Sequence, residues 1–186
     1  MRVLIGCEES GTVREAFKRM GHDAWSCDIL PTRIPGQHYQ CDIREVLDYG
    51  WDLGIFFPPC TRLANSGVRW LHERNLWAEM REAVEFFCML HDADIEKIAI
   101  ENLIPHRYAV ELIGRKYNQI IQPWQFGHGE QKATCLWLKN LQELEPTNIV
   151  DGREQIVWKM PPGPNRARDR SKTYDGIADA FAAQWG

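Results

Sequence analysis

Short apolar segments alternate with helix-like segments along this chain, and this alternation limits the folds open to it. The expected strands are residues 3–5, 24–27, 39–42, 51–57, 97–100, 119–122 and 134–138. The expected helices are 12–20, 76–90, 107–113 and 176–184, where apolar residues recur every three or four positions. The pattern predicts an α/β fold with a doubly wound, mostly parallel sheet.

In sheets of this kind, ligands bind beyond the carboxyl ends of the strands. The residues at or just beyond the predicted ends are chemically versatile, and they are Gly6, Asp28, Asp42, Cys60 and Glu101. Because parallel strands end at the same edge, we expect a functional site there.

Composition predicts one globular domain over residues 1–186, since 44% of residues are hydrophobic and 26% charged. No apolar run approaches the ~20 residues of a membrane span, and the N-terminus does not resemble a secretory signal, so we expect a cytoplasmic protein with no membrane partner. The six cysteines form no C-x-x-C pair and fit no zinc template, which predicts reduced thiols and no metal.

Charge is distributed unevenly. The net charge is −4, yet residues 153–172 carry +4, so the remainder of the chain carries −8. We interpret 153–172 as a basic loop in which Arg168 and Arg170 could contact a phosphate backbone, although a solvated loop without a ligand would show the same composition.

The strongest local signal is the sequence Phe57-Pro58-Pro59-Cys60, which follows the clearest predicted strand. Two prolines make a rigid turn, and a cysteine fixed beyond the sheet is placed to act as a nucleophile. Glu101-Asn102 ends the next long strand, and a carboxyl group beside a thiol can donate a proton. Each residue also has a structural interpretation, as a buried cysteine in a proline turn and as a capping or ion-paired glutamate.

Together these segments resemble the DNA (cytosine-5) methyltransferases in compact form. In that family a Pro-Pro-Cys turn supplies the nucleophile and a Glu-Asn pair supplies the acid. Further matching segments occur in the family's order over about residues 3–138, and they are Asp28, Cys41-Asp42-Ile43-Arg44, Ser66-Gly67, Phe126-Gly127 and Gln131-Lys132. The residues from Arg170 through the last helix loosely resemble the family's closing motif.

The resemblance implies a reaction and a set of residues. Cys60 would add to C6 of cytosine, with Glu101 as the acid and Asn102 as a further catalytic residue, and C5 would then take a methyl group from S-adenosylmethionine. The implied cofactor-binding residues are Gly6, Gly11, Asp28, Asp42 and Pro58. The implied substrate-binding residues are Ser66, Gln131 and Lys132, to which the basic segment adds Arg168 and Arg170.

The sequence also departs from the family pattern. The loop from Gly6 to Gly11 lacks the dense Phe-x-Gly-x-Gly, and Ala133 and Cys135 stand where the family has paired arginines. Only 35 positions separate Cys135 from Arg170, which leaves no room for a separate target-recognition domain. The lack of room for a target-recognition domain implies low sequence specificity, a partner protein that supplies recognition, or a smaller substrate. Compact enzymes of this appearance occur in phage genomes.

Two alternatives remain beside DNA methylation at C5. The chain could methylate a free cytosine nucleotide, or it could be a non-catalytic module that binds the cofactor or a nucleic acid. Methylation of an exocyclic amine is disfavoured, because Phe57 and Cys60 flank the prolines where that chemistry needs an amide or carboxylate and an aromatic ring. His128 could contact phosphate or base, or lie in a solvated turn, and the tryptophans at 70, 77, 124 and 137 are core candidates of which one near the cleft could stack on a base.

Overall fold

The computed structural model describes residues 1–163 and 166–186, although it does not describe the side chains of residues 158 and 167–169. One sheet of seven strands runs through the described residues in the order β3-β2-β1-β4-β5-β7-β6. The strands are β1 Arg2–Gly6, β2 Asp23–Asp28, β3 His38–Gln40, β4 Leu53–Phe56, β5 Lys97–Leu103, β6 Gln119–Ile121 and β7 Thr134–Lys139. The five strands from β3 to β5 pair in parallel, whereas β7 is antiparallel to both β5 and β6.

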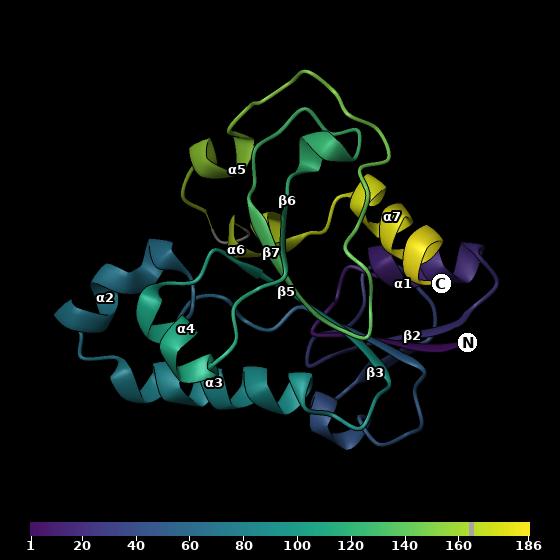
Figure 1. Cartoon of the computed structure of the whole chain (residues 1–186), viewed down its shortest axis with the longest axis horizontal. Helices are drawn as coiled ribbons and strands as arrows, with labels where there is room; N and C mark the ends of the chain where they lie inside the picture. Colours follow the sequence, from purple (N-terminus) through teal and green to yellow (C-terminus); the bar gives the residue numbers. More distant parts are fainter. Residues whose placement is uncertain (164–165) are drawn as a thin grey trace.

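Helices lie on both sides of the sheet (Figure 1). The α-helices are α1 Thr12–Arg19, α2 Val68–Glu73, α3 Trp77–His91, α4 Arg107–Ile113, α5 Ile156–Lys159, α6 Arg166–Ser171 and α7 Asp175–Trp185. Three short 3₁₀ helices join them, and these are η1 Ile43–Glu45, η2 Asn65–Gly67 and η3 Pro123–Gln125. The doubly wound, mostly parallel α/β fold is therefore confirmed. No helix in the described part of the chain is both long and apolar enough to span a bilayer.

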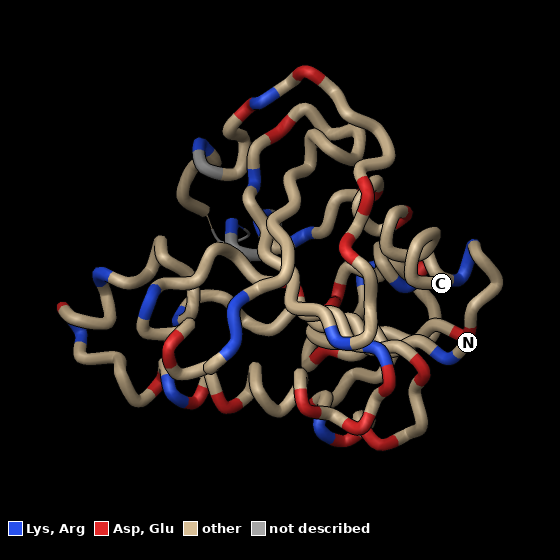
Figure 2. Tube along the Cα trace, in the orientation of Figure 1, with Lys and Arg blue, Asp and Glu red and all other residues tan. Residues whose placement is uncertain are grey.

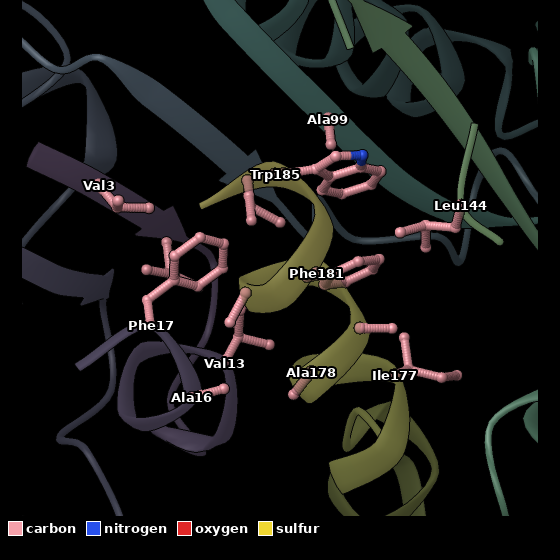
Figure 3. Packing of buried hydrophobic residues seen from close by; sticks show 14 of the residues in the cluster. Val3, Val13, Ala16, Phe17, Ala99, Leu144, Ile177, Ala178, Phe181 and Trp185 are labelled. Atoms are coloured by element: carbon pink, nitrogen blue, oxygen red, sulfur yellow. The ribbon is translucent and has the colours of Figure 1, made fainter. Parts of the chain in front are cut away.

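One face of the sheet packs against α1 and α7 (Figure 3). Val3, Ile5 and Ala99 point from the strands into this cluster, where they meet Phe17 of α1 and Phe181 of α7. The Phe181 and Trp185 rings stack with centroids 4.7 Å apart. Because neighbouring residues of a strand point to opposite faces, the residue two positions after Ala99, which is Glu101, also lies on the α7 side.

The other face packs against α3, α4 and η1. Leu4, Phe56 and Ile100 point from the strands into this second cluster, and Phe87 of α3 reaches Trp137 of β7 with ring centroids 5.0 Å apart. The two clusters together bury nearly every side chain of β1 and β4. The central strands are thus held from both sides, and their carboxyl ends form a rigid base for the loops beyond them.

The structure differs from the expected elements at several positions, and three of these differences bear on the site. Glu101 and Asn102 lie inside β5. This strand continues to Leu103, because β7 pairs with it from Ile98 to Leu103. The segment 153–172, expected as a loop, contains α5 and α6. The sequence pattern did not predict helix α2, because its six residues are too few to show a helical period.

Candidate active site

The turn after β4 presents Cys60 at the carboxyl edge of the sheet. Pro58 is buried and Pro59 is exposed, so the chain leaves the sheet within two residues. The Cys60 carbonyl then accepts hydrogen bonds from the backbone N–H groups of Leu63 and Ala64, at 3.0 and 2.8 Å. These two bonds close a tight turn, and the Cys60 side chain remains partly exposed.

His106 ties the loop that follows Cys60 to the start of α4. Its imidazole accepts a hydrogen bond at Nδ1 from the Ala109 backbone N–H, at 3.0 Å, and caps the helix. The opposite nitrogen, Nε2, lies 2.9 Å from the Arg62 carbonyl and therefore carries the proton that it donates. The His106 backbone N–H also donates to the Leu63 carbonyl at 3.0 Å. The loop that carries the thiol is thereby fixed to β5 and α4.

Three charged groups act on the Cys60 thiol. Burial raises the pKa of Cys60, and the Glu101 carboxylate raises it further, whereas Lys132 and Arg170 lower it. These influences place the four residues in one neighbourhood, although they come from four separate segments. The predicted nucleophile, the predicted acid and two predicted substrate-binding cations are thus brought together.

Glu101 and Asn102 point in opposite directions. Burial raises the pKa of Glu101, which Lys132 and a hydrogen bond with the Thr134 side chain partly offset. Asn102 lies on the α3 side, is 2% exposed, and its amide oxygen and nitrogen have no hydrogen-bond partner among the described residues. The geometry therefore associates Glu101, but not Asn102, with the neighbourhood of Cys60.

A cavity of about 300 Å³ lies between the loop before β7 and helices α5, α6 and α7. Arg170, Lys172 and Met160 are among the residues that line it. A smaller hollow that contains Glu101 and Lys132 shares Thr173 and Tyr174 with this cavity. The two spaces therefore adjoin one another across these two residues.

Polar contacts hold the wall of the cavity in place. The Tyr174 hydroxyl donates to the Glu130 carboxylate at 2.6 Å, which raises the pKa of Tyr174 together with burial. The Gly176 backbone N–H donates to Nε2 of His128 at 3.0 Å. A side chain on Gly176 would lie 1.9 Å from the Phe126 carbonyl oxygen, so only glycine allows α7 to begin this close to the loop before β7.

A second group of predicted residues lies beyond β1 and β2. Burial raises the pKa of the Cys7 thiol to about 12, and the carboxylates of Asp28 and Asp42 contribute to the rise. Their influence places both carboxylates near the end of β1. Packing favours glycine at position 6, because a Cβ atom there would lie 1.9 Å from Cδ1 of Ile43. Gly11 begins α1 with φ +77°, a conformation that favours glycine.

The carboxylates of Asp28 and Asp42 differ in how many of their oxygens already accept hydrogen bonds. One Asp28 oxygen accepts the Leu30 backbone N–H at 2.9 Å, and burial raises the pKa of this carboxyl group. Asp42 caps η1, with one oxygen on the Arg44 backbone N–H at 3.0 Å and the other on the Arg44 guanidinium at 2.7 Å. Asp28 is therefore the more available acceptor of the two.

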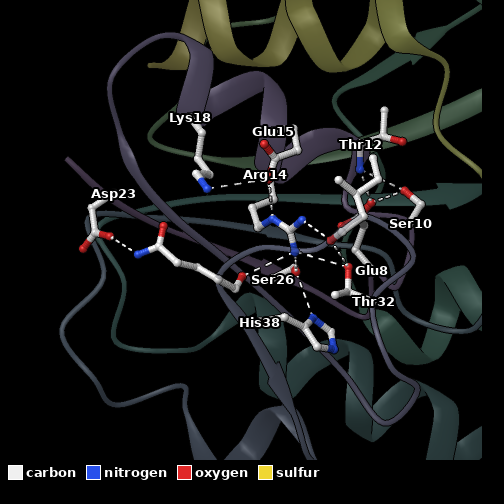
Figure 4. Close-up of polar contacts among 12 residues, drawn as sticks. Glu8, Ser10, Thr12, Arg14, Glu15, Lys18, Asp23, Ser26, Thr32 and His38 are labelled. Carbon is white, nitrogen blue, oxygen red and sulfur yellow. Dashed lines mark hydrogen bonds and ion pairs between the residues drawn. The ribbon is translucent and has the colours of Figure 1, made fainter.

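Buried Arg14 fastens the loop after Asp28 to α1 (Figure 4). Its guanidinium donates to the Ser26 hydroxyl at 2.9 Å, the Thr32 hydroxyl at 3.2 Å and the Ile34 carbonyl at 2.6 Å. It also pairs with Glu15 at 2.9 Å. These contacts fix residues 29–37, which border the end of β2 where Asp28 lies.

The remaining predicted substrate-binding residues lie in other surroundings. Ser66 is exposed in η2, and Gln131 is exposed with its side chain 3.4 Å from the Gln155 amide. Arg168 lies in α6, but its side chain is outside the described residues. In the part of the chain that the structure describes, no three His, Cys, Asp or Glu side chains are arranged to hold a metal ion.

Sequence reasoning missed several residues that shape the site. Thr134, Thr173 and Tyr174 border the space around Glu101, and His106 holds the loop after Cys60. Arg14 lies in the expected helix 12–20, whose pattern gives it no particular role, and it is fully buried. A buried arginine has no sequence signature of its own, because its partners other than Glu15 lie 12 to 23 positions away along the chain.

Solved structures with similar folds are known. A prophage-encoded protein of E. coli, named as a DNA modification methyltransferase, gives a TM-score of 0.51 at 14% identity, over 81% of this chain and 52% of that chain. Entamoeba histolytica methyltransferase EhMeth gives 0.49 at 14% identity, over 81% of this chain and 57% of its own. S. pombe Dnmt2 methyltransferase gives 0.46 at 16% identity, over 86% and 54%.

This chain spans about half the length of the prophage protein. No protein-family model matches the sequence, and no curated protein is significantly similar to it. The likeness to the prophage protein shows a shared fold. The fold is the Rossmann-like fold of S-adenosylmethionine-dependent methyltransferases.

Proposed function

We propose that this protein transfers a methyl group from S-adenosylmethionine to C5 of cytosine in DNA, through a covalent adduct with Cys60. The observation that carries the proposal is that Cys60 follows β4 and Glu101 lies in the neighbouring parallel strand β5, at one edge of the sheet where Lys132 and Arg170 also act on the thiol. The turn holds a nucleophile, the neighbouring strand holds an acid, and two cations balance the charge.

The chemistry follows from the needs of the cytosine ring, whose C5 is a poor nucleophile. The Cys60 thiolate adds at C6 while Glu101 donates a proton to N3, and C5 becomes an enamine carbon. The cofactor, when bound, supplies an electrophilic methyl group. After C5 has accepted the methyl group, a base removes the C5 proton, the Cys60 thiolate leaves from C6, and N3 returns its proton to Glu101. A target base in a duplex must first leave the helix, at a cost of a few kcal/mol.

The charges around Glu101 and Cys60 suit the roles of an acid and a nucleophile, respectively. A carboxyl group whose pKa is raised by burial keeps its proton to higher pH, as the acid at N3 requires. The thiol has the opposite need, since only its thiolate attacks. Lys132 and Arg170 favour the thiolate, and protonation of Glu101 removes the negative charge that opposes it. The state with protonated Glu101 and ionised Cys60 is therefore mutually favourable.

The residues beyond β1 and β2 fit the proposed cofactor. Asp28 offers a carboxylate for the ribose hydroxyls, with one oxygen already oriented by the Leu30 backbone N–H. Ile29 follows directly and is 73% exposed, so it offers an apolar surface to an adenine ring. Asp42, whose oxygens are both engaged with Arg44, fits less well as a direct contact. Gly6, Gly11 and Pro58 would shape the space rather than bind through side chains.

The experiment is to trap the adduct. DNA that contains 5-fluorocytosine is incubated with S-adenosylmethionine and the protein, because fluorine at C5 cannot leave as a proton. We expect a covalent complex at Cys60 by mass spectrometry, absent in Cys60→Ala and retained in Cys88→Ala, which alters a partly buried thiol on α3. No adduct with DNA or with the free nucleotide, or an equal adduct in Cys60→Ala, would refute the mechanism.

Methylation of a free cytosine nucleotide is the second candidate. It is favoured by the cavity of about 300 Å³, where the cations Arg170 and Lys172 are matched by Glu130 and Asp175. Such a balanced lining suits one phosphate better than a polyanion. The two substrates differ in salt dependence, since polymer binding weakens steeply as salt rises whereas binding of a single nucleotide does not. Cofactor binding without transfer to either substrate would instead indicate a binding module.

A further inference from the structure

Helix α2 carries an exposed aromatic side chain between two cations. Trp70 is 41% exposed, and the guanidinium carbons of Arg74 and Arg69 lie 4.2 and 5.5 Å from the centre of its ring system. Arg69 also pairs with Glu73. We call Arg69, Trp70 and Arg74 the Trp70 platform. Residues 61–76 hold three arginines and one acid, in a chain whose net charge is −4. Blue positions on α2 mark this excess (Figure 2).

The helix that carries the platform is held rigidly. The rings of His72 and Trp77 meet edge to face with centroids 5.0 Å apart, and Trp77 meets Tyr108 at 5.2 Å. Tyr108 in turn contacts His106 at 5.9 Å, and His106 donates to a carbonyl in the loop after Cys60. A continuous set of contacts therefore fixes α2 relative to the nucleophile.

We propose that the Trp70 platform stacks an unpaired base of the DNA strand, beside the cytosine held at Cys60. The inference rests on the proposed function and names a single-stranded or locally opened polymer as the substrate class. The Arg74 guanidinium lies over the indole, and a base can stack either on the guanidinium plane or on the indole face after displacing it, while the two arginines attract the flanking phosphates. Both arginines favour an anionic partner over a neutral apolar one. A platform fixed relative to Cys60 needs no ordering when the strand binds.

The test measures the affinity of a dye-labelled single-stranded oligonucleotide by fluorescence anisotropy. We expect Trp70→Ala to weaken binding by about 5- to 150-fold, the range for loss of one stacked base. Trp70→Phe should restore part of the affinity, because it keeps an aromatic face. The matched control is Tyr49→Ala, which removes an aromatic residue that is 50% exposed and belongs to neither site; it should bind like the wild type.

The salt dependence of binding distinguishes the contribution of Arg74 from that of Trp70. Arg74→Ala should reduce the slope of log K against log salt by about one unit, whereas Trp70→Ala should leave the slope unchanged because the indole carries no charge. Equal affinities for Trp70→Ala and Tyr49→Ala would overturn the proposal. Self-association that Trp70→Ala abolishes, with oligonucleotide affinity retained, would also overturn it in favour of a second copy of the chain. Absence of the 5-fluorocytosine adduct bears on catalysis alone, since these affinities do not depend on it.

Discussion

Replacement of Arg14 tests whether the buried guanidinium organises the loop beyond Asp28. Arg14→Met keeps a long side chain of similar shape and removes the hydrogen bonds to Ser26, Thr32 and Ile34 together with the pair to Glu15. The loop would lose its attachment to α1. We expect lower stability and, because Asp28 precedes the loop, weaker binding of S-adenosylmethionine.

The magnitude follows from what the former partners keep. The Ser26 hydroxyl still contacts His38 at 2.9 Å, and the Ile34 carbonyl still accepts from Thr32 at 3.0 Å. Glu15 is partly exposed and can be solvated. Buried Glu8 loses the favourable influence of Arg14 but can take up a proton, because burial already raises its pKa, so the loss should be about 3 kcal/mol, at the low end for a broken buried ion pair. For a domain of this size that corresponds to a fall in Tm of about 6–12 °C.

Urea unfolding followed by circular dichroism measures the difference. The control is Arg19→Met in the same helix, whose guanidinium pairs with Asp179 at 2.5 Å but is 61% exposed. Exposed pairs contribute less than about 1 kcal/mol, so this variant should remain close to the wild type. A loss in Arg14→Met that is no larger than in Arg19→Met would refute the view that these contacts hold the loop.

Three further predictions concern the sheet edge. Gly6→Ala should cost about 1–3 kcal/mol by overpacking against Ile43, and adding Ile43→Val, which removes the clashing Cδ1 atom, should recover part of it in urea unfolding; no recovery would contradict the packing account. Alkylation of Cys60 by iodoacetamide, followed by mass spectrometry, should keep accelerating as pH rises above the ordinary thiol range, because its pKa is raised and only the thiolate reacts. At a fixed pH, Lys132→Ala should slow this alkylation and Glu101→Gln should speed it, and reversed signs would exclude the assigned electrostatics. His106→Ala should lower the free energy of unfolding by about 2 kcal/mol through loss of a helix cap and one further hydrogen bond, and a change under half of that would argue against its role in holding the loop.

Much of the edge where the site lies could be predicted from local sequence. Pro58 and Pro59 end a strand wherever they occur, because proline lacks the N–H that a central strand needs. The same local logic located the ends of β1 and β2, and with them Gly6 and Asp28. The roles of individual side chains were harder to predict from the sequence. Glu101 and Asn102 are neighbours in sequence, yet strand alternation sends one toward α7 and the other into the α3 side.

The sequence by itself determined the alternating elements, the α/β class and the placement of Cys60 just beyond a strand, because these depend on residues within one turn or one strand of each other. Only the tertiary structure decided which groups surround that thiol. Lys132 and Arg170 lie 72 and 110 positions beyond Cys60 and reach it because β7 returns antiparallel beside β5 and α6 precedes the final helix. The spacing of apolar residues in a sequence indicates which face of a helix or strand a residue occupies. The charges around a thiol depend instead on contacts between residues that are far apart along the chain.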